Sequence, residues 1–195
     1  MPSDALTAWR EVGLARLDEL EGIHRQATGT RPGRRWGTRE LNRSLFIALV
    51  AQFQTYCRAL HDAAVETHVV AANPEQAELL RRLLRGGRAL DRMTPRTDAL
   101  GIDFGRLGFR IVETIRARSR QAMEDLRRLD TLVDFRNAIG HGNETAAAAL
   151  VATGEIRETK ASFREYRRAI HRLAIMMDGV VAERLSRMLG VPPPW

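Results

Sequence analysis

Cysteine is nearly absent from the chain: Cys57 is the only one among 195 residues. A single cysteine excludes an internal disulfide and is typical of a reducing compartment. The sequence has no run of about 18 apolar residues, which a membrane-spanning helix would need. Its first residues include acidic side chains instead of the apolar segment of a signal peptide. We therefore expect a soluble cytoplasmic protein that does not contact a membrane.

Lysine is equally scarce, and arginine takes its place. Lys160 is the one lysine among 31 basic residues, so the other 30 are arginine, and 24 acidic residues leave a formal charge of +7. Guanidinium forks match the geometry of phosphate, and a basic surface favours nucleic acid as a partner. An arginine-rich composition can equally reflect genome base content, with most charges on solvated helix faces. Charge alone leaves both interpretations open.

The sequence also lacks alternating apolar and polar runs, internal repeats and low-complexity tracts. Apolar residues instead recur every three or four positions, which is the spacing of amphipathic helices. Hydrophobic residues make up 44% of the chain, enough for a globular core, and 195 residues are few for two domains. We predict an all-α helical bundle of about five to six helices that forms a single domain over residues 1–195.

Two helices are predicted in the first third of the chain. The first begins at the cap residue Ser3, covers about 4–23 and has an inward stripe of five apolar residues (Leu6, Trp9, Leu17, Leu20 and Ile23). Thr38 is a suitable cap for a long second helix over about 39–70. The apolar stripe of this second helix is broad, which predicts a central helix covered on several sides.

The middle of the chain is less regular. A short third helix is predicted over about 75–85, with four leucines facing inward (Leu79, Leu80, Leu83 and Leu84). The stretch 88–108 is predicted to be a helix-to-helix crossover, because its glycines lack the spacing of a phosphate-binding loop. Helical spacing returns near Phe109 and continues, with a possible kink, to about 140. A last helix begins between 159 and 162 and ends near 189.

The connector between the first two helices contains three arginines and a tryptophan (Arg31, Arg34, Arg35 and Trp36). Guanidinium groups beside an aromatic ring can bind phosphates and stack on a base, so these residues are candidates for RNA binding. The alternative is a solvated loop whose tryptophan folds onto the core.

No metal site and no cofactor are predicted. His61 and His68 are seven residues apart on the second helix, so they share a face, but no third ligand has a suitable spacing. We interpret both histidines as packing or surface side chains.

The segment that reads LVDFRNAIGHGN holds the strongest candidate site. Arg136, Asn137 and His141 lie at the end of a predicted amphipathic helix, and a guanidinium near an imidazole that titrates near neutrality suits a phosphate-bearing substrate. Five residues along a continuous helix separate two side chains by about 140°. We expect Gly140 to adopt a left-handed conformation that ends the helix and turns His141 back toward Arg136, with similar freedom at Gly142.

This segment resembles the Arg-x-x-x-x-His signature of the HEPN superfamily, in which a polar residue commonly follows the arginine. Arg136, Asn137 and His141 match that signature. The long apolar helix before it (LNRSLFIALVAQFQTYCRAL) and the long helix after it are also similar to that family. The resemblance covers about 39–189 and is greatest for the RiboL-PSP group. Many toxins of the superfamily that pair with a nucleotidyltransferase antitoxin carry a tyrosine where this chain has Asn143, so silencing by nucleotidylation there is not expected.

The resemblance implies a metal-independent endoribonuclease, usually of a toxin–antitoxin or antiphage defence system, that acts as a homodimer with two motifs facing each other. RNA is then the substrate, and an antitoxin or neighbouring defence protein is a further partner. Arg136 would hold the scissile phosphate and His141 would transfer protons while the 2′-hydroxyl attacks, leaving a 2′,3′-cyclic phosphate. The alternative is a HEPN-like helical module that binds RNA, a nucleotide or a partner protein without cutting RNA.

Overall fold

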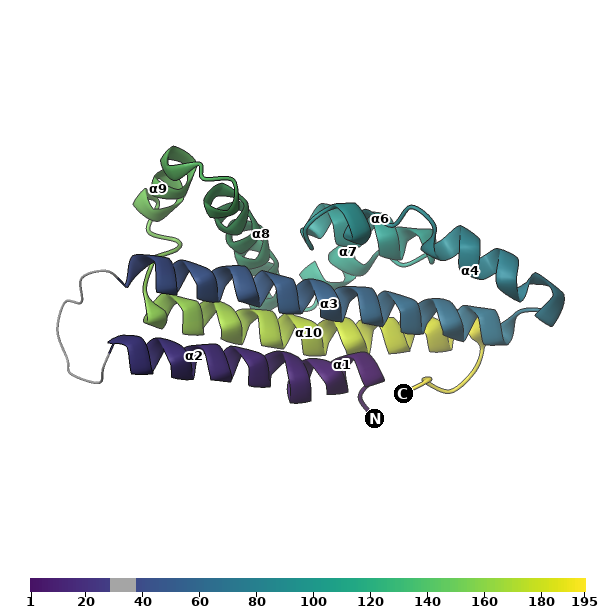
Figure 1. Ribbon diagram of the computed structural model, residues 1–195. Helices are drawn as coiled ribbons and strands as arrows, with labels where there is room; N and C mark the ends of the chain where they lie inside the picture. The colour runs from purple at the N-terminus through teal and green to yellow at the C-terminus, as the bar shows by residue number, and fades with distance from the viewer. Residues whose placement is uncertain (29–37) are drawn as a thin grey trace.

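The computed structural model describes residues 1–28 and 38–195, and these residues fold into helices without a β-strand (Figure 1). The α-helices are α1 (Asp4–Ala8), α2 (Leu14–Thr28), α3 (Arg39–Ala71), α4 (Ala77–Arg85), α5 (Ala89–Arg92), α6 (Thr97–Arg106), α7 (Ile111–Arg116), α8 (Arg120–Gly140), α9 (Glu144–Ala152) and α10 (Lys160–Leu189). The predicted all-α bundle is confirmed, although it has more helices than predicted. Over the described residues, no helix is both long and apolar enough to cross a membrane.

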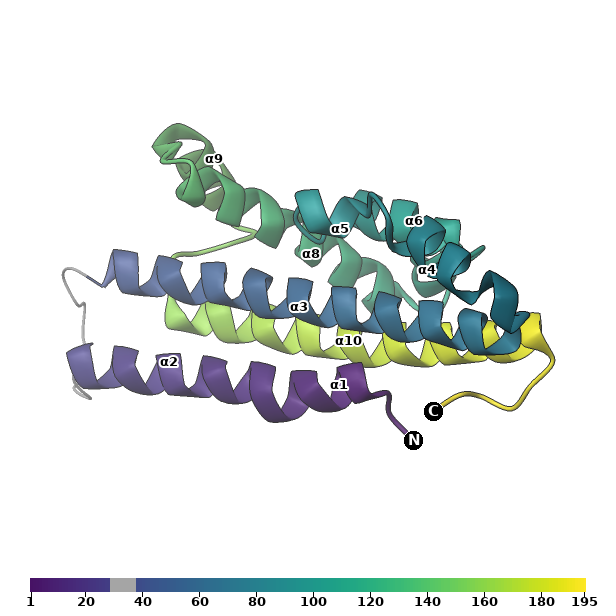
Figure 2. The same cartoon turned by 45° about the vertical axis from the view of Figure 1, so that its right-hand side comes forward.

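The two longest helices, α3 and α10, lie side by side at the centre of the molecule and run in the same direction (Figure 1, Figure 2). Along their contact, the Tyr56 hydroxyl donates a hydrogen bond to the Ala174 carbonyl oxygen at 2.6 Å. The Phe46 ring packs edge-on against the Phe163 ring, with centroids 5.8 Å apart. All four residues are buried. The prediction that the helix over about 39–70 is central and covered on several sides is therefore confirmed.

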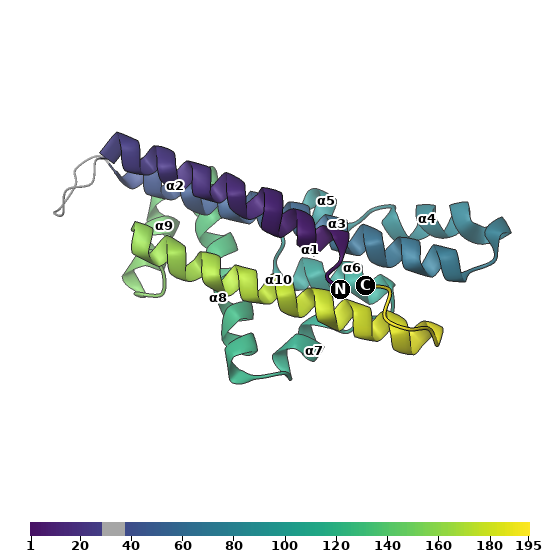
Figure 3. The ribbon, with the colours of Figure 1, turned by 90° about the horizontal axis from the view of Figure 1, so that it is seen from below.

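The N-terminal helices α1 and α2 run antiparallel to α3 and cover one side of the central pair (Figure 3). A π-helical turn, Trp9–Gly13, joins them. Ser3 caps α1 as predicted, because its hydroxyl oxygen accepts a hydrogen bond from the Leu6 N–H at 3.1 Å. The same hydroxyl donates to the buried Asp178 carboxylate of α10, which fixes the start of the chain on the central pair.

The inward stripe predicted for the first helix is correct only as far as Leu17. Leu20 and Ile23 are exposed, whereas Glu21 and His24 are buried. The reason is helical geometry. Ile23, six residues after Leu17, lies about 120° around the helix from it, whereas Glu21 and His24, four and seven residues after Leu17, return to the inward face. The apolar spacing therefore did not predict that two polar residues, Glu21 and His24, lie on the inward face of this helix.

Helix α8 crosses the central pair on the side opposite α1 and α2 (Figure 1). Its Phe135 ring packs edge-on against Phe46 of α3, with centroids 5.3 Å apart. Its fully buried Asp125 carboxylate accepts hydrogen bonds from Arg172 of α10 at 2.6 and 2.9 Å. The Ser119 side chain caps the start of α8, so the continuous helix predicted before the motif is two helices, α7 and α8.

The stretch 88–108, predicted to be an irregular crossover, contains the helices α5 and α6. Asp103 on α6 is fully buried, and its carboxylate accepts hydrogen bonds from the backbone N–H groups of Ala89 and Leu90 at 2.7 and 2.8 Å. It thereby caps the first turn of α5. A four-residue helix has too few internal hydrogen bonds to persist alone, so α5 depends on a carboxylate that comes later in the chain.

Helix α4 follows a 3-10 turn, Pro74–Gln76, and packs mainly on α3. Its four leucines do not all face inward as predicted. Leu80 and Leu84 pack against the core, but Leu79 and Leu83 are 56% and 57% exposed. Because α4 packs mainly on one helix, α3, it buries only one stripe of its surface.

Candidate functional site

The helix that carries the motif ends in a Schellman motif. The Asn143 N–H donates to the Ala138 carbonyl oxygen at 2.8 Å, and the Gly142 N–H donates to the Ile139 carbonyl oxygen at 3.2 Å. Gly142 has a φ of 67°, the left-handed conformation that this ending requires. The Asn143 side chain then accepts from the Ala146 N–H and caps α9. The predicted freedom at Gly142 is confirmed, and it ends the helix.

The expectation for Gly140 is wrong. Gly140 is the last residue of α8 and keeps a helical backbone, and His141 follows as the C-cap with φ −99° and ψ 6°. The left-handed turn lies at Gly142, two residues later than predicted. The Schellman hydrogen bonds place it there. On this continuous helix Arg136 and His141 point about 140° apart around the axis. Within one chain the two side chains therefore do not converge.

Arg136 carries a positive charge that no carboxylate of the described residues neutralises. Its side chain is half-buried, and its Nη1 donates to the Asn137 Oδ1 at 3.2 Å. The nearest acidic residue in the sequence, Asp134, is occupied by an ion pair with Arg96. Arg136 is thus held by its neighbour and remains available to an anion.

His141 is exposed, and its side chain forms no hydrogen bond within the described part of the chain. Only its backbone is fixed, because its N–H donates to the Asn137 carbonyl oxygen at 3.0 Å. The imidazole can therefore exchange protons with a bound molecule without breaking a contact of the fold. Asn137 serves both residues: its backbone ends the helix at His141, and its side chain orients Arg136.

A charge network that the sequence did not reveal holds the segment after the motif. Arg43 of α3 is only 6% exposed, and it binds Glu144 at 2.6 Å and Glu158 at 2.7 Å. Arg39 binds the same two carboxylates at 2.8 and 2.7 Å. Glu144 is the first residue of α9, directly after Asn143. The network therefore ties the loop that ends α8 to the start of α3 and to the connection before α10.

The charges in this network shift one another's protonation. The hydrogen bond from Arg43 lowers the pKa of Glu144 from 4.5 to about 2. The hydrogen bond to Glu144 outweighs the effect of burial and raises the pKa of Arg43. Such partners lie about a hundred residues apart in the sequence, so no local spacing could have identified them.

This network predicts a pH dependence of stability. A carboxyl whose pKa is lower in the folded state stabilises the fold above its unfolded pKa, and this contribution is lost as the pH falls. The free-energy difference of unfolding between wild type and Glu144→Gln should therefore shrink between pH 4.5 and about 2. Urea unfolding at a series of pH values measures it. Glu19→Gln, which removes an exposed carboxyl on α2, is the control; a difference for Glu144→Gln that does not change with pH contradicts the prediction.

The two glycines of the motif should respond in opposite ways to alanine. Gly142→Ala places a Cβ in a left-handed conformation and should lower the free energy of unfolding by about 1–2 kcal/mol. Gly140→Ala should leave it unchanged or raise it slightly, because the nearest atom to a new Cβ is Arg136 Nη1 at 4.0 Å and the backbone is helical. Chemical unfolding of both variants measures the two effects. A larger loss of unfolding free energy for Gly140→Ala than for Gly142→Ala would contradict a left-handed turn at Gly142.

The remaining candidates from the sequence are the residues of the connector and the two histidines of α3. Arg31, Arg34, Arg35 and Trp36 lie outside the described residues. His61 is fully buried with its ring edge-on to Phe104, and His68 stacks on Phe109. Burial lowers the pKa of both histidines, so the interpretation of these two as packing residues is confirmed. Within residues 1–28 and 38–195, no three histidine, cysteine or acidic side chains gather as a metal site.

Comparisons with known proteins leave the chain without an assigned family. No family model matches it, and no curated protein and no solved structure is significantly similar to it. Any functional conclusion therefore depends on the residues at the end of α8, their surroundings and the resemblance of their spacing to the HEPN signature.

Proposed function

We propose that this protein is a metal-independent endoribonuclease of HEPN type whose site lies at the end of α8. Arg136, Asn137 and His141 would form it, and RNA would be its substrate. The resemblance favours a cytoplasmic role in toxin–antitoxin or antiphage defence, with an antitoxin or a neighbouring defence protein as a further partner.

One observation supports this proposal above the others. Arg136 is half-buried and has no carboxylate partner among the described residues, while an exposed, uncommitted imidazole follows it at His141. Several other arginines that are buried or half-buried, among them Arg43, Arg96 and Arg167, are instead paired with carboxylates. A charge left without a counterion near an exposed imidazole suits a substrate that supplies the negative charge itself.

The chemistry requires no metal because RNA contains its own nucleophile. A base removes the proton of the 2′-hydroxyl, and the resulting oxygen attacks the adjacent phosphorus. The bond from phosphorus to the 5′-oxygen breaks, and an acid protonates that oxygen. His141 can act as base or acid, and Arg136 can stabilise the charge on the phosphorane oxygens. The products are a 2′,3′-cyclic phosphate and a 5′-hydroxyl.

A second copy of the chain would complete the site. One imidazole cannot act as base and acid in the same step, and each chain has a single histidine at the motif. The continuous helix through Gly140 also points Arg136 and His141 in different directions. Both points favour a homodimer in which His141 of one copy faces the motif of the other.

The same geometry supports a second candidate function. If no second copy faces the motif, two side chains that diverge around one helix cannot act on one phosphate. The protein would then be a helical module that binds RNA, a nucleotide or a partner protein without cleaving RNA.

Cleavage of RNA in EDTA distinguishes the two candidates. Purified protein is incubated with total RNA and, separately, with DNA of matched length, each in excess EDTA. The nuclease proposal predicts that RNA is shortened and DNA is not, because DNA lacks the 2′-hydroxyl. RNA that is bound but stays intact supports the module, and cleavage of both polymers excludes 2′-hydroxyl attack.

A further inference from the structure

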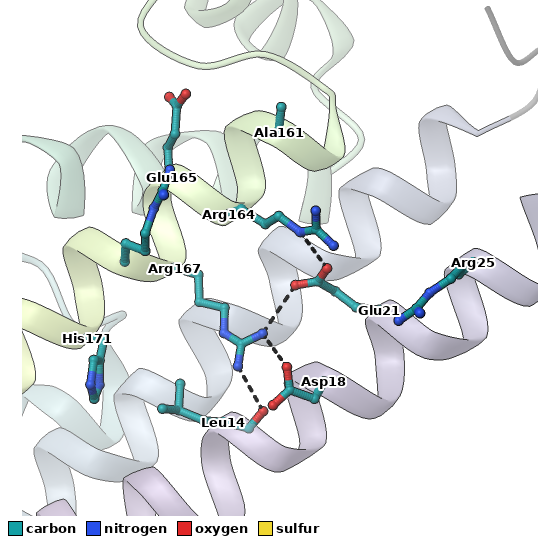
Figure 4. Close-up of a pocket in the computed structure, with 10 residues that line it drawn as sticks. Leu14, Asp18, Glu21, Arg25, Ala161, Arg164, Glu165, Arg167 and His171 are labelled. Atoms are coloured by element: carbon teal, nitrogen blue, oxygen red, sulfur yellow. Dashed lines mark hydrogen bonds and ion pairs between the residues drawn. The ribbon is translucent and has the colours of Figure 1, made fainter. Parts of the chain in front are cut away.

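An open groove of about 680 Å³ lies between α2 and α10 (Figure 4), and none of the residues that line it belongs to the motif. Both helices pack on α3, and side chains from each of them line the groove. Its volume falls in the range of about 300–1,000 Å³ that is usual for small-molecule sites. The groove is therefore large enough for a nucleotide or a sugar phosphate.

One buried carboxylate organises the cations of this groove. Glu21 of α2 is only 5% exposed and accepts from Arg164 at 2.8 Å and from Arg167 at 3.2 Å, both on α10 (Figure 4). Lys160 lies 3.6 Å from the same carboxylate, and Asp18 binds Arg167 at 2.7 Å. These three cations surround two carboxylates, Glu21 and Asp18, which leaves an excess of one positive charge, and the ion pairs form without a ligand.

Two further arginines line the groove without a partner. Arg25 of α2 and Arg168 of α10 are exposed and form no ion pair or hydrogen bond with a described residue. Glu165 is the remaining acidic residue of the lining, so four arginines there face three carboxylates. The unpaired guanidiniums, together with the free Nη atoms of Arg164, present donors to a ligand rather than to the fold.

A histidine of the groove, His171, lies close enough to the arginines to be affected by their positive charges. His171 lines the groove, and its Nδ1 accepts a hydrogen bond from the Trp9 indole N–H at 3.1 Å. A neutral imidazole that accepts at Nδ1 carries its proton on Nε2. Burial lowers the pKa of His171, and the charges of Arg10 and Arg167 lower it further. An anion in the groove would oppose both charges.

We propose that the groove between α2 and α10 binds a phosphate monoester through Arg25, Arg164 and Arg168. A phosphate monoester is close to doubly charged near neutral pH and has three oxygens that accept hydrogen bonds, which matches several guanidinium forks around one open space. The ligand is either a free nucleotide or the 5′-phosphate end of a nucleic-acid strand. This inference does not depend on RNA cleavage at Arg136 and His141.

Titration of the 195-residue chain tests the groove, with the His171 ring protons observed by NMR at constant ionic strength. The probes are inorganic phosphate, a nucleoside 5′-monophosphate, and a DNA oligonucleotide with and without a 5′-phosphate. DNA resists 2′-hydroxyl attack, so failure of the nuclease proposal cannot affect the result. We expect saturable binding that raises the pKa of His171 by about half a pH unit or more. A response to the mononucleotide alone identifies a small-molecule site, and a response to the 5′-phosphorylated strand identifies a strand end.

Matched arginine variants locate the binding. Arg168→Gln should weaken the binding of the monophosphate about tenfold or more, because a charge-assisted hydrogen bond is lost. Arg187→Gln, which removes an exposed arginine near the other end of α10, should not change it. Equal affinities for the two variants, or an oligonucleotide that binds equally with and without its 5′-phosphate, would overturn the proposal.

Discussion

His141→Ala should lower the rate of RNA cleavage in EDTA by about 10²–10⁴-fold, the range expected when a general acid–base group is lost. The side chain of His141 is exposed and forms no hydrogen bond with the described residues, so its removal leaves the packing of the fold intact. The helical circular dichroism and the urea midpoint of the variant should therefore match those of wild type. Initial rates on one RNA pool give the ratio.

Two arginine variants of the same helix complete this experiment. Arg136→Ala should reduce the rate about 10²–10³-fold, because a preorganised donor to the phosphorane oxygens is lost. Arg120→Ala removes an exposed, unpaired arginine at the opposite end of α8 and should retain activity close to wild type. A His141→Ala variant that cleaves as fast as wild type would exclude His141 as the proton-transfer group. Equal losses for Arg136→Ala and Arg120→Ala would mean that only overall charge matters.

Asp103→Ala should lower the free energy of unfolding by about 2–4 kcal/mol, because each buried polar group left without a partner costs about 1–3 kcal/mol. The Asp103 carboxylate is fully buried and accepts from two backbone N–H groups, those of Ala89 and Leu90, both of which are buried residues. Without this acceptor neither N–H can reach water. Urea unfolding of the variant measures the loss.

Two further aspartate variants separate hydrogen bonding from general effects on α6. Asp103→Asn keeps one oxygen acceptor in the same place and should lose less stability than Asp103→Ala. Asp98→Ala removes an exposed carboxylate of the same helix and should stay within about 0.5 kcal/mol of wild type. If Asp103→Ala is no more destabilising than Asp98→Ala, the claim that Asp103 stabilises the fold by capping α5 is wrong.

The parts of the fold that follow from nearest neighbours in the chain were predictable. The spacing of apolar residues in α3 located that helix to within about one residue at its C-terminal end. Ser3 as the first cap followed from the preference of serine for that position, and the Thr159 side chain caps the last helix within the predicted range. Such features depend on contacts within one helical turn.

Features that depend on distant partners could not be predicted. Helix α5 exists because of Asp103, and the exposure of Leu79 follows from how few helices cover α4. Neither fact is visible in the local pattern. The motif residues themselves follow from a local spacing, but the left-handed turn lies at Gly142 instead of Gly140, and the Arg43 network joins elements far apart in the chain.

The chemical nature of the product ends tests the proposed mechanism most directly. RNA cleaved by the purified protein in EDTA is analysed by mass spectrometry for its terminal groups, with His141→Ala in parallel. Attack by the 2′-hydroxyl predicts 2′,3′-cyclic phosphates and 5′-hydroxyls from wild type, and neither from the variant. Ends with a 3′-hydroxyl and a 5′-phosphate, or cleavage that appears only when a divalent metal is restored, would contradict it.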